Sequence, residues 1–358
     1  MTFTCSATGL PEPMITWSKS QGSLPASSNI TSEGKLTILN VTTDDSGSYL
    51  CNATNAIGTN SSFVALKVFC SLVHINKPTF SAVAYVSQAL KLSCPTSSGS
   101  VVLWMHNGTM SLPQESLIQA PHTLVIPSLS KDHAGNYSCV SGNSLQWNTS
   151  ISVKYPETCT KVKQNLCDVG SGDFVIDPDG EQGEAPFTVS CNMTDKGGIG
   201  VTAVSHDSEN RVHVIGFDPP GSYSRDIHYI GTSLSQVKEL MAVSKYCQQF
   251  IKYECKGSRL NSRTQQIAWW MSREGETMAY WSEASEVYQG CACAVNSSCA
   301  SPQKLCNCDK NDLVWREDSG LLTNKSHLPV SQLRFGDAGE TGEEGYHTLG
   351  KLECYGMN

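Results

Sequence analysis

The sequence predicts a mainly β protein, with two tandem β-sandwiches followed by a C-terminal domain of mixed α and β structure. Three observations support this fold class. A pattern of Cys, Trp, Tyr and Cys occurs twice within residues 1–156. Short alternating apolar runs are separated by Gly, Pro, Ser and Asn. After residue 156 the repeat stops, and Trp, Cys and Gly become denser. We therefore expect domains at residues 1–69, 70–156 and 157–358.

Each copy of the repeat contains the residues that a two-sheet sandwich needs at its centre. One disulfide joins the facing sheets, a Trp packs over the sulfurs, and a Tyr two residues before the second Cys returns its hydroxyl to nearby backbone. The residues are Cys5, Trp17, Tyr49 and Cys51 in the first copy and Cys94, Trp104, Tyr137 and Cys139 in the second. The geometry predicts the disulfides Cys5–Cys51 and Cys94–Cys139.

Both copies resemble the immunoglobulin superfamily, in the intermediate-set form found in adhesion molecules. The resemblance covers about 150 residues. The first copy lacks the opening strand, because the sequence before Cys5 already reads as the middle of a strand. We therefore expect that the chain is truncated at its N-terminus and that a signal peptide was lost with the missing part.

The C-terminal domain opens with a predicted hairpin. Residues 167–177 and 185–193 read as strands joined by a turn at Asp177-Pro-Asp-Gly180. This segment resembles the opening of fibrinogen-like domains, which imply an α+β fold. Further on, Ser233 and Gln236 form a predicted capping box. The helix that follows carries an apolar stripe of Leu234, Val237, Leu240, Met241, Tyr246 and Phe250, with Cys247 on the same helix.

The last third of the chain carries the most distinctive motifs. They are Cys306-Asn-Cys308-Asp309, Trp315-Arg-Glu-Asp318-Ser-Gly, Leu328-Pro-Val-Ser-Gln-Leu-Arg-Phe-Gly336-Asp337 and Leu349-Gly-Lys-Leu-Glu-Cys354. In this order they resemble the fibrinogen-like segment of the neurexin-IV and contactin-associated protein family, over residues 159–354. That family places discoidin and laminin-G domains around this segment, whereas here immunoglobulin-like domains precede it. The resemblance therefore does not extend to the function of the whole protein.

Sixteen cysteines indicate an oxidising, extracellular route. Beyond the two sandwich disulfides we expect local pairs Cys167–Cys191 and Cys247–Cys255. The sequence does not assign partners to Cys70, Cys159, Cys291, Cys293, Cys299, Cys306, Cys308 and Cys354. Cys70 stands apart at the junction of the two repeats, so either it pairs with a C-terminal cysteine, or two cysteines stay free or bond between chains. A disulfide-linked oligomer through Cys70 is one hypothesis.

Glycosylation sequons are unusually frequent. Ten of the nineteen Asn residues begin an N-x-[ST] triplet, which predicts a glycoprotein. The acceptors are Asn29, Asn40, Asn52, Asn60, Asn107, Asn136, Asn148, Asn192, Asn296 and Asn324.

No cofactor is required, and calcium is the metal candidate that the residues raise. Asp309, Asn311, Asp312 and Asp318 could offer oxygen ligands from one loop. The alternative is a solvated turn in which Asp caps local backbone. The two C-x-C units could also bind zinc, but the sequons favour disulfides there.

Composition and motifs favour a binding protein over an enzyme. The sequence lacks the nucleophile-elbow, zinc-protease and phosphate-loop motifs. A net charge of −8 disfavours nucleic acid, and no apolar run is long enough for a transmembrane helix. We expect a non-enzymatic extracellular protein, secreted, in the matrix or at the cell surface. It would act in adhesion or matrix assembly through contacts with other proteins or matrix components. The alternative is an immune lectin that binds glycans, with or without calcium, for which Trp269, Trp270 and Trp281 could line a sugar pocket.

Overall fold

The computed structural model divides the chain into two compact units, Met1–Ile151 and Ser152–Asn358. It describes residues 1–39, 41, 45–66, 68, 71–77, 80–96, 100–119, 122–142, 144–166, 169–262, 265–281 and 290–358. The boundary expected between residues 69 and 70 lies outside these ranges. The second boundary falls five residues earlier than the expected 156/157, within a strand that runs to Lys154.

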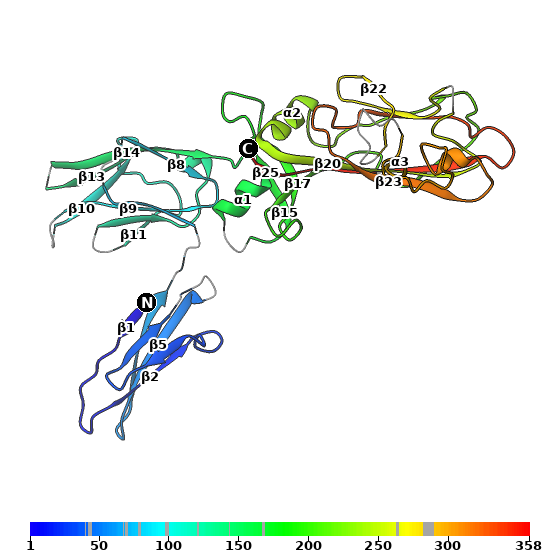
Figure 1. Cartoon of the computed structure of the whole chain (residues 1–358). Helices are drawn as coiled ribbons and strands as arrows, with labels where there is room; N and C mark the ends of the chain where they lie inside the picture. Colours follow the sequence, from blue (N-terminus) through cyan, green and yellow to red (C-terminus); the bar gives the residue numbers. More distant parts are fainter. Residues whose placement is uncertain are drawn as a thin grey trace. The chain divides into compact units, whose positions relative to one another are not determined.

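The first sandwich consists of two three-stranded sheets (Figure 1). One has the order β1-β4-β3 and the other β2-β5-β6. Their bounds are β1 Thr2–Thr4, β2 Met14–Lys19, β3 Ser28–Ile30, β4 Lys35–Ile38, β5 Gly47–Thr54 and β6 Thr59–Leu66. Cys5 and Cys51 join the sheets with their Cα atoms 6.5 Å apart. The Trp17 indole N–H donates to the Gly34 carbonyl at 3.1 Å.

Gly34 is the residue that this close approach requires. Its φ of +78° lies in the left-handed region, and a Cβ there would stand 2.4 Å from the Cys5 carbonyl oxygen. Only glycine meets both conditions without strain.

The second sandwich has two four-stranded sheets, β10-β13-β14-β8 and β11-β12-β9-β7. Their strands are β7 Leu72–Ile75, β8 Ser81–Tyr85, β9 Ala89–Ser93, β10 Val102–His106, β11 Leu117–Gln119, β12 Thr123–Ile126, β13 Gly135–Ser141 and β14 Ser144–Lys154, with the short helix η2 at Lys131–His133. Cys94 and Cys139 join the sheets at a Cα separation of 6.1 Å. Trp104 packs edge-on against Trp147 in the core.

Both sandwiches close the corner before their second cysteine in the same way. The Tyr49 hydroxyl donates to the Asp45 carbonyl at 2.6 Å, and the Tyr137 hydroxyl donates to the His133 carbonyl at 2.8 Å. Both tyrosines are fully buried. Because the hydroxyls are desolvated, the pKa of each phenol is raised above its ordinary value.

The C-terminal unit is built on one large sheet with the order β15-β16-β17-β25-β20-β23, with β18 also paired to β25. A smaller sheet has the order β19-β24-β21-β22. The larger sheet comprises β15 Gly172–Ile176, β16 Phe187–Asn192, β17 Val201–Val204, β18 Val212–Val214, β20 Ser244–Lys256, β23 Arg316–Leu322 and β25 Glu344–Met357. The other elements are α1 Cys159–Asn165, β19 Tyr223–Asp226, α2 Leu234–Val243, β21 Trp269–Met271, β22 Thr277–Met278, α3 Ala292–Val295, η3 Cys308–Lys310 and β24 Gln332–Phe335.

The predicted hairpin is confirmed as β15 and β16, in which Phe174 lies opposite Val189. The Asp177 carboxylate accepts the backbone N–H of Gly180 at 3.0 Å, and Gly180 has a φ of +77°. The side chain of the turn's first Asp thus closes the turn, and its glycine supplies the left-handed residue.

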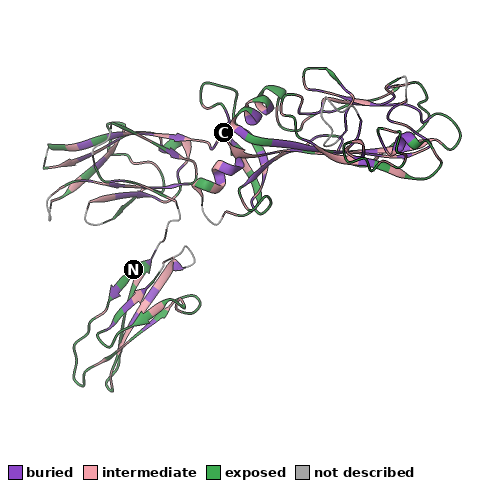
Figure 2. Cartoon of the chain, in the orientation of Figure 1, coloured by how far each residue is buried: buried purple, intermediate pink, exposed green. Residues whose placement is uncertain are grey.

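The predicted helix is right at its start and wrong at its end. Ser233 and Gln236 form the expected capping box at the start of α2, with bonds of 3.1 and 2.8 Å. The helix ends at Val243, and Tyr246, Cys247 and Phe250 belong to β20. Figure 2 shows buried and half-buried stretches along the long strands of this unit. Beyond Gln249 the buried residues of β20 recur at every second position, through Ile251 and Tyr253 to Cys255. That alternation is the period of a strand between two neighbours, here β25 and β23.

The two local disulfides expected in this unit are wrong. Cys191 bonds to Cys159, Cys247 to Cys354 and Cys255 to Cys308. Cys247 and Cys255 lie on one strand, where eight residues span about 26 Å. A disulfide needs Cα atoms within about 7 Å. Cys291–Cys306 and Cys293–Cys299 complete the set of described pairs, so the C-x-C units form disulfides rather than a zinc site. Cys70 and Cys167 lie outside the described residues.

Candidate functional site

The loop from residue 306 to 318 carries the carboxylates that the sequence proposed for calcium. Asp309 is 2% exposed, and its Oδ1 accepts the backbone N–H groups of Asn261 at 2.8 Å and Leu260 at 3.2 Å. Burial raises the pKa of the Asp309 carboxyl to about 6, and the nearby Asp318 carboxylate adds to this rise. Asp309 therefore anchors residues 260–261 to the loop.

Asp318 likewise accepts backbone hydrogen bonds, here within the loop itself. Its two oxygens accept the backbone N–H groups of Asn307 at 3.0 Å and Cys308 at 2.9 Å. Asp318 is buried, and burial raises the pKa of its carboxyl. These bonds hold in place Cys308, whose sulfur bonds to Cys255 on β20.

The expected calcium ligands do not fit a metal site. Both oxygens of Asp312 are bound by the Arg316 guanidinium, at 3.0 and 2.7 Å, which lowers the pKa of Asp312 to about 2. Asn311 ends η3 in the left-handed region with a φ of +53°. Within the described ranges, the metal-sized cluster that includes Asp318 pairs it with Cys291 and Cys306, whose sulfurs are bonded to each other. The carboxylates bind backbone and arginine donors, so the alternative of local caps describes them.

A second acidic cluster, formed by Asp218, Asp337 and Glu343, also has a cation partner of its own. The Arg259 guanidinium binds both oxygens of Asp337, at 2.8 and 2.7 Å, and the Arg259 backbone N–H donates to the same carboxylate. This bidentate pair fixes the loop at residue 337 to the segment after β20.

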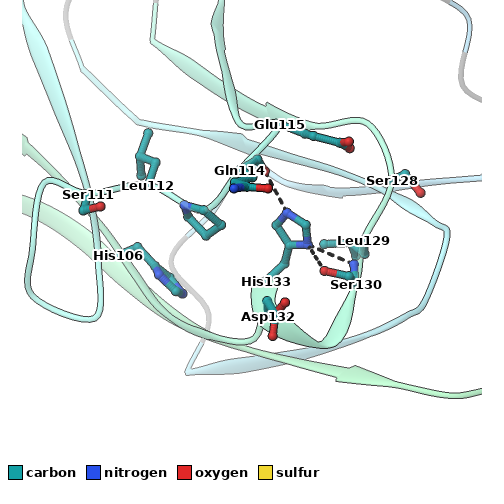
Figure 3. Close-up of a pocket in the computed structure, with 11 residues that line it drawn as sticks. His106, Ser111, Leu112, Gln114, Glu115, Ser128, Leu129, Ser130, Asp132 and His133 are labelled. Carbon is teal, nitrogen blue, oxygen red and sulfur yellow. Dashed lines mark hydrogen bonds between the residues drawn. The ribbon is translucent and has the colours of Figure 1, made fainter.

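The second sandwich contains a cavity of about 460 Å³ next to η2 (Figure 3). The His133 Nδ1 accepts the Ser130 backbone N–H at 2.9 Å and lies 2.8 Å from the Ser130 Oγ. Since Nδ1 is an acceptor, the ring proton is on Nε2, which lies 2.9 Å from the Gln114 carbonyl and donates to it. Ser130 and His133 thus form the capping box of η2, and their hydrogen bonds close a corner of the fold.

The C-terminal unit exposes an apolar surface that was not among the sites expected from the sequence. Leu313, Val314 and Trp315 are consecutive and 65%, 57% and 46% exposed. The Trp315 ring lies 5.7 Å from the half-buried ring of Tyr346 on β25. We call these four residues the Trp315 surface. The signal in the sequence was a run of three large apolar residues directly after a polar loop.

Charged groups around the Trp315 surface are paired with one another. The Arg211 guanidinium stacks 3.3 Å from the centre of the Tyr346 ring and binds Glu254 at 2.7 Å. Lys256 lies over the Trp315 ring at 5.9 Å and binds Glu344 at 3.3 Å. The centre of the surface is therefore aromatic and aliphatic, with a rim whose charges largely offset each other.

The tryptophans proposed for a sugar pocket lie elsewhere. Trp270 and Trp281 are fully buried in the core of the C-terminal unit. Trp269 is half-buried and packs against Gly221, where a Cβ would lie 2.1 Å from its ring. Trp270 and Trp281 therefore belong to the core.

The sequon asparagines lie at the surface wherever the structure describes them. Asn52 and Asn192 are half-buried. The exposed acceptors are Asn29, Asn60, Asn107, Asn136, Asn148, Asn296 and Asn324. Asn40 lies outside the described residues.

Among the helices in the described ranges, none has both the length and the hydrophobicity needed to cross a lipid bilayer.

Residues 1–68 match the immunoglobulin I-set domain family. Neurexin-4 of Drosophila melanogaster is 38% identical over 189 residues, which are 51% of this chain and 15% of that protein. Contactin-associated protein 1 of Homo sapiens is 35% identical over 204 residues, 56% of this chain and 14% of that protein. Since 204 residues cannot fit within Met1–Ile151, that match extends into the C-terminal unit.

These findings confirm both resemblances that the motifs predicted, to I-set domains and to the neurexin-IV and contactin-associated proteins. The aligned part is a small share of those relatives. A solved structure of titin domains I67-I69, an E-to-A mutated variant, is 22% identical and covers 59% of this chain and 79% of that chain. Its TM-score is 0.21, so this superposition supports no further conclusion.

Proposed function

From the relationship to the neurexin-IV and contactin-associated proteins, we propose that this chain is a non-enzymatic adhesion module outside the cell. It acts through protein–protein contacts, either at the cell surface or as a secreted component of the matrix. An I-set domain and seven described disulfides support this setting. Glycosylation at the ten sequons is part of the proposal.

The single observation that carries the proposal is the Trp315 surface. Large exposed apolar patches on soluble proteins often mark contact sites. Trp, Tyr and Arg are also the residues that most often dominate binding energies at interfaces. Trp315, Tyr346 and Arg211 meet at this surface, surrounded by paired charges that suit the polar rim of an interface.

The experiment is a bead-adhesion assay with the full chain secreted from eukaryotic cells. One relative is named for its association with contactin, so beads coated with the chain are mixed with contactin ectodomain beads and with one another. Aggregation in either mixture, reversed by soluble chain, supports adhesion and separates the heterophilic from the homophilic form. Beads that stay dispersed in both mixtures contradict adhesion through these two partners.

The lectin alternative is tested with the same material on a glycan array, with and without calcium. Binding of a defined sugar that is unaffected by changes at the Trp315 surface would replace the adhesion proposal.

The covalent state is a further part of the proposal, because Cys70 would link two chains in a disulfide-bonded oligomer. Fourteen of the sixteen cysteines form the described disulfides, and Cys70 and Cys167 lie outside the described residues.

A further inference from the structure

All three sequons of the second sandwich lie on one sheet. Asn136 is on β13 and Asn148 on β14, which are hydrogen-bonded neighbours. Asn107 directly follows β10, the strand on the other side of β13. The opposite sheet, β11-β12-β9-β7, carries no sequon.

The Asn136 and Asn148 triplets lie opposite each other on the paired strands β13 and β14. Asn136 lies opposite Ser150, and Ser138 lies opposite Asn148. The asparagine of each triplet therefore faces the hydroxyl residue of the other. Asn136 and Asn148 are diagonal neighbours on the ladder, a relationship that places residues about 7–8 Å apart.

The alternation of the strands sends both asparagines to the outer face of the sheet. Tyr137 on β13 and Trp147 and Thr149 on β14 are buried, so the residues between them point outward. Asn136 and Asn148 are accordingly exposed.

The turn after β10 brings the third acceptor against the first. The Asn107 backbone N–H donates to the Asn136 carbonyl at 2.8 Å, and the Asn107 Oδ1 accepts the Asn136 backbone N–H at 2.9 Å. A sugar is attached through Nδ2, so the Oδ1 contact is compatible with glycosylation. Asn107 has a φ of +50° and precedes Gly108, the usual composition of a tight hairpin turn.

The other sequons are arranged differently. In the first sandwich Asn29 lies on the β1-β4-β3 sheet. Asn52 and Asn60 lie on the paired strands β5 and β6, but Asn60 lies opposite Ala53, so the two asparagines point to opposite faces of the sheet. In the C-terminal unit, Asn324 follows β23 at an exposed position. Its Oδ1 accepts the Ser326 hydroxyl of its own triplet at 2.6 Å.

We propose that Asn107, Asn136 and Asn148 carry a single crowded cluster of N-glycans that covers the outer face of β10, β13 and β14. The inference rests on the glycosylation part of the proposed function. N-glycans are bulky, and adjacent attachment points restrict the access of trimming enzymes to each sugar. The clustered sites therefore keep a larger fraction of untrimmed, oligomannose glycans than isolated sites, and this face is closed to protein partners.

The test is site-resolved mass spectrometry of glycopeptides from the full chain secreted by a eukaryotic cell line. The cluster predicts an oligomannose fraction at Asn136 and Asn148 several-fold above that at Asn324. Ser150→Ala removes the Asn148 sequon while keeping the asparagine, and should raise the trimmed fraction at Asn136. Ser326→Ala, which removes the Asn324 sequon of the C-terminal unit, is the matched control and should leave Asn136 unchanged.

Equal processing at all sites, or an Asn136 profile that ignores Ser150→Ala, would overturn the cluster. Sugar at Asn324 with none at the three clustered sites would overturn it as well. If Asn324 and every other sequon are bare, the glycosylation part of the proposed function fails with it. Bead adhesion is measured separately, so failure of the adhesion proposal remains distinguishable.

Discussion

The Asp318 carboxylate accepts the backbone N–H of Cys308 at 2.9 Å, next to the disulfide that ties this loop to β20. The neighbouring oxygen accepts the Asn307 N–H. One buried side chain thus accepts hydrogen bonds from two backbone N–H groups, that of buried Cys308 and that of half-buried Asn307, which assigns the Asp a structural role in the loop.

Asp318→Ala should lower the free energy of unfolding by about 3 kcal/mol, because the buried Cys308 N–H and the half-buried Asn307 N–H lose their acceptor. Hydrogen exchange on the full chain should show faster exchange at Asn307 and Cys308. Glu317→Ala is the control, since Glu317 is exposed and forms a surface pair with Lys252 that contributes less than about 1 kcal/mol. Unchanged exchange at the two amides in Asp318→Ala would contradict the assignment.

Two buried groups of the C-terminal unit should give opposite pH dependences. Burial raises the pKa of Asp309 to about 6 from 3.8, so its contribution to stability is present below pH 4 and lost as pH rises to 6. Burial lowers the pKa of His347 to about 4 from 6.5, so its contribution is present above pH 6.5 and lost as pH falls to 4. Each effect amounts to about 3 kcal/mol, and together they largely cancel.

Single substitutions should expose each slope. His347→Gln keeps a partner for the Tyr223 hydroxyl, which lies 2.7 Å from His347 Nε2. With only the Asp309 effect left, the free energy of unfolding of this variant should fall as the pH rises from 4 to 6. In Asp309→Asn only the His347 effect is left, so the free energy of unfolding should increase as the pH rises from 4 to 6. Chemical unfolding at a series of pH values measures both. Parallel profiles for the two variants would show that these groups do not titrate as described.

The corner hydroxyls should stabilise each sandwich independently. Tyr137→Phe removes the bond to the His133 carbonyl and leaves that carbonyl buried without this donor, at a cost of about 1–2 kcal/mol. Tyr49→Phe is the matched change in the first sandwich. Hydrogen exchange should increase only in the sandwich that carries the substitution. Faster exchange in both sandwiches for either variant would be inconsistent with separate cores.

The proposed oligomer through Cys70 predicts a dimer band on non-reducing electrophoresis that disappears in Cys70→Ser. Peptide mapping identifies the bond directly. A monomer in which a Cys70 peptide is linked to a Cys167 peptide would exclude the oligomer and assign the last two cysteines to each other.

Local chemistry explains what could be predicted from the sequence. The Cys–Trp–Tyr repeat predicts both sandwiches, because the disulfide, the indole and the corner hydroxyl act within one small core. The capping box at Ser233 predicts the start of α2, since it depends on residues three apart. The turn at Asp177 is predictable for the same reason.

Long-range pairing explains what could not be predicted. The strand period that follows Val243 is visible only once β25 and β23 are known to flank β20. Cys247 pairs with Cys354 across 107 residues, a distance at which spacing carries no information. The acidic loop resembled a metal site because its donors, Asn261 and Leu260 among them, come from a distant segment. The sequence shows that Trp315 is a large apolar residue, but its solvent exposure is known only from the fold.

The most direct measurement of the central claim is the binding of the full chain to contactin ectodomain, and to itself, for wild type and Trp315→Ser. An interface centred on Trp315 predicts a loss of about 2 kcal/mol or more, roughly 30-fold in Kd. Ile118→Ser, which changes an apolar residue that is 65% exposed in the second sandwich, should leave Kd unchanged. Binding that survives Trp315→Ser, or is weakened equally by Ile118→Ser, would contradict the assignment of the contact to the Trp315 surface.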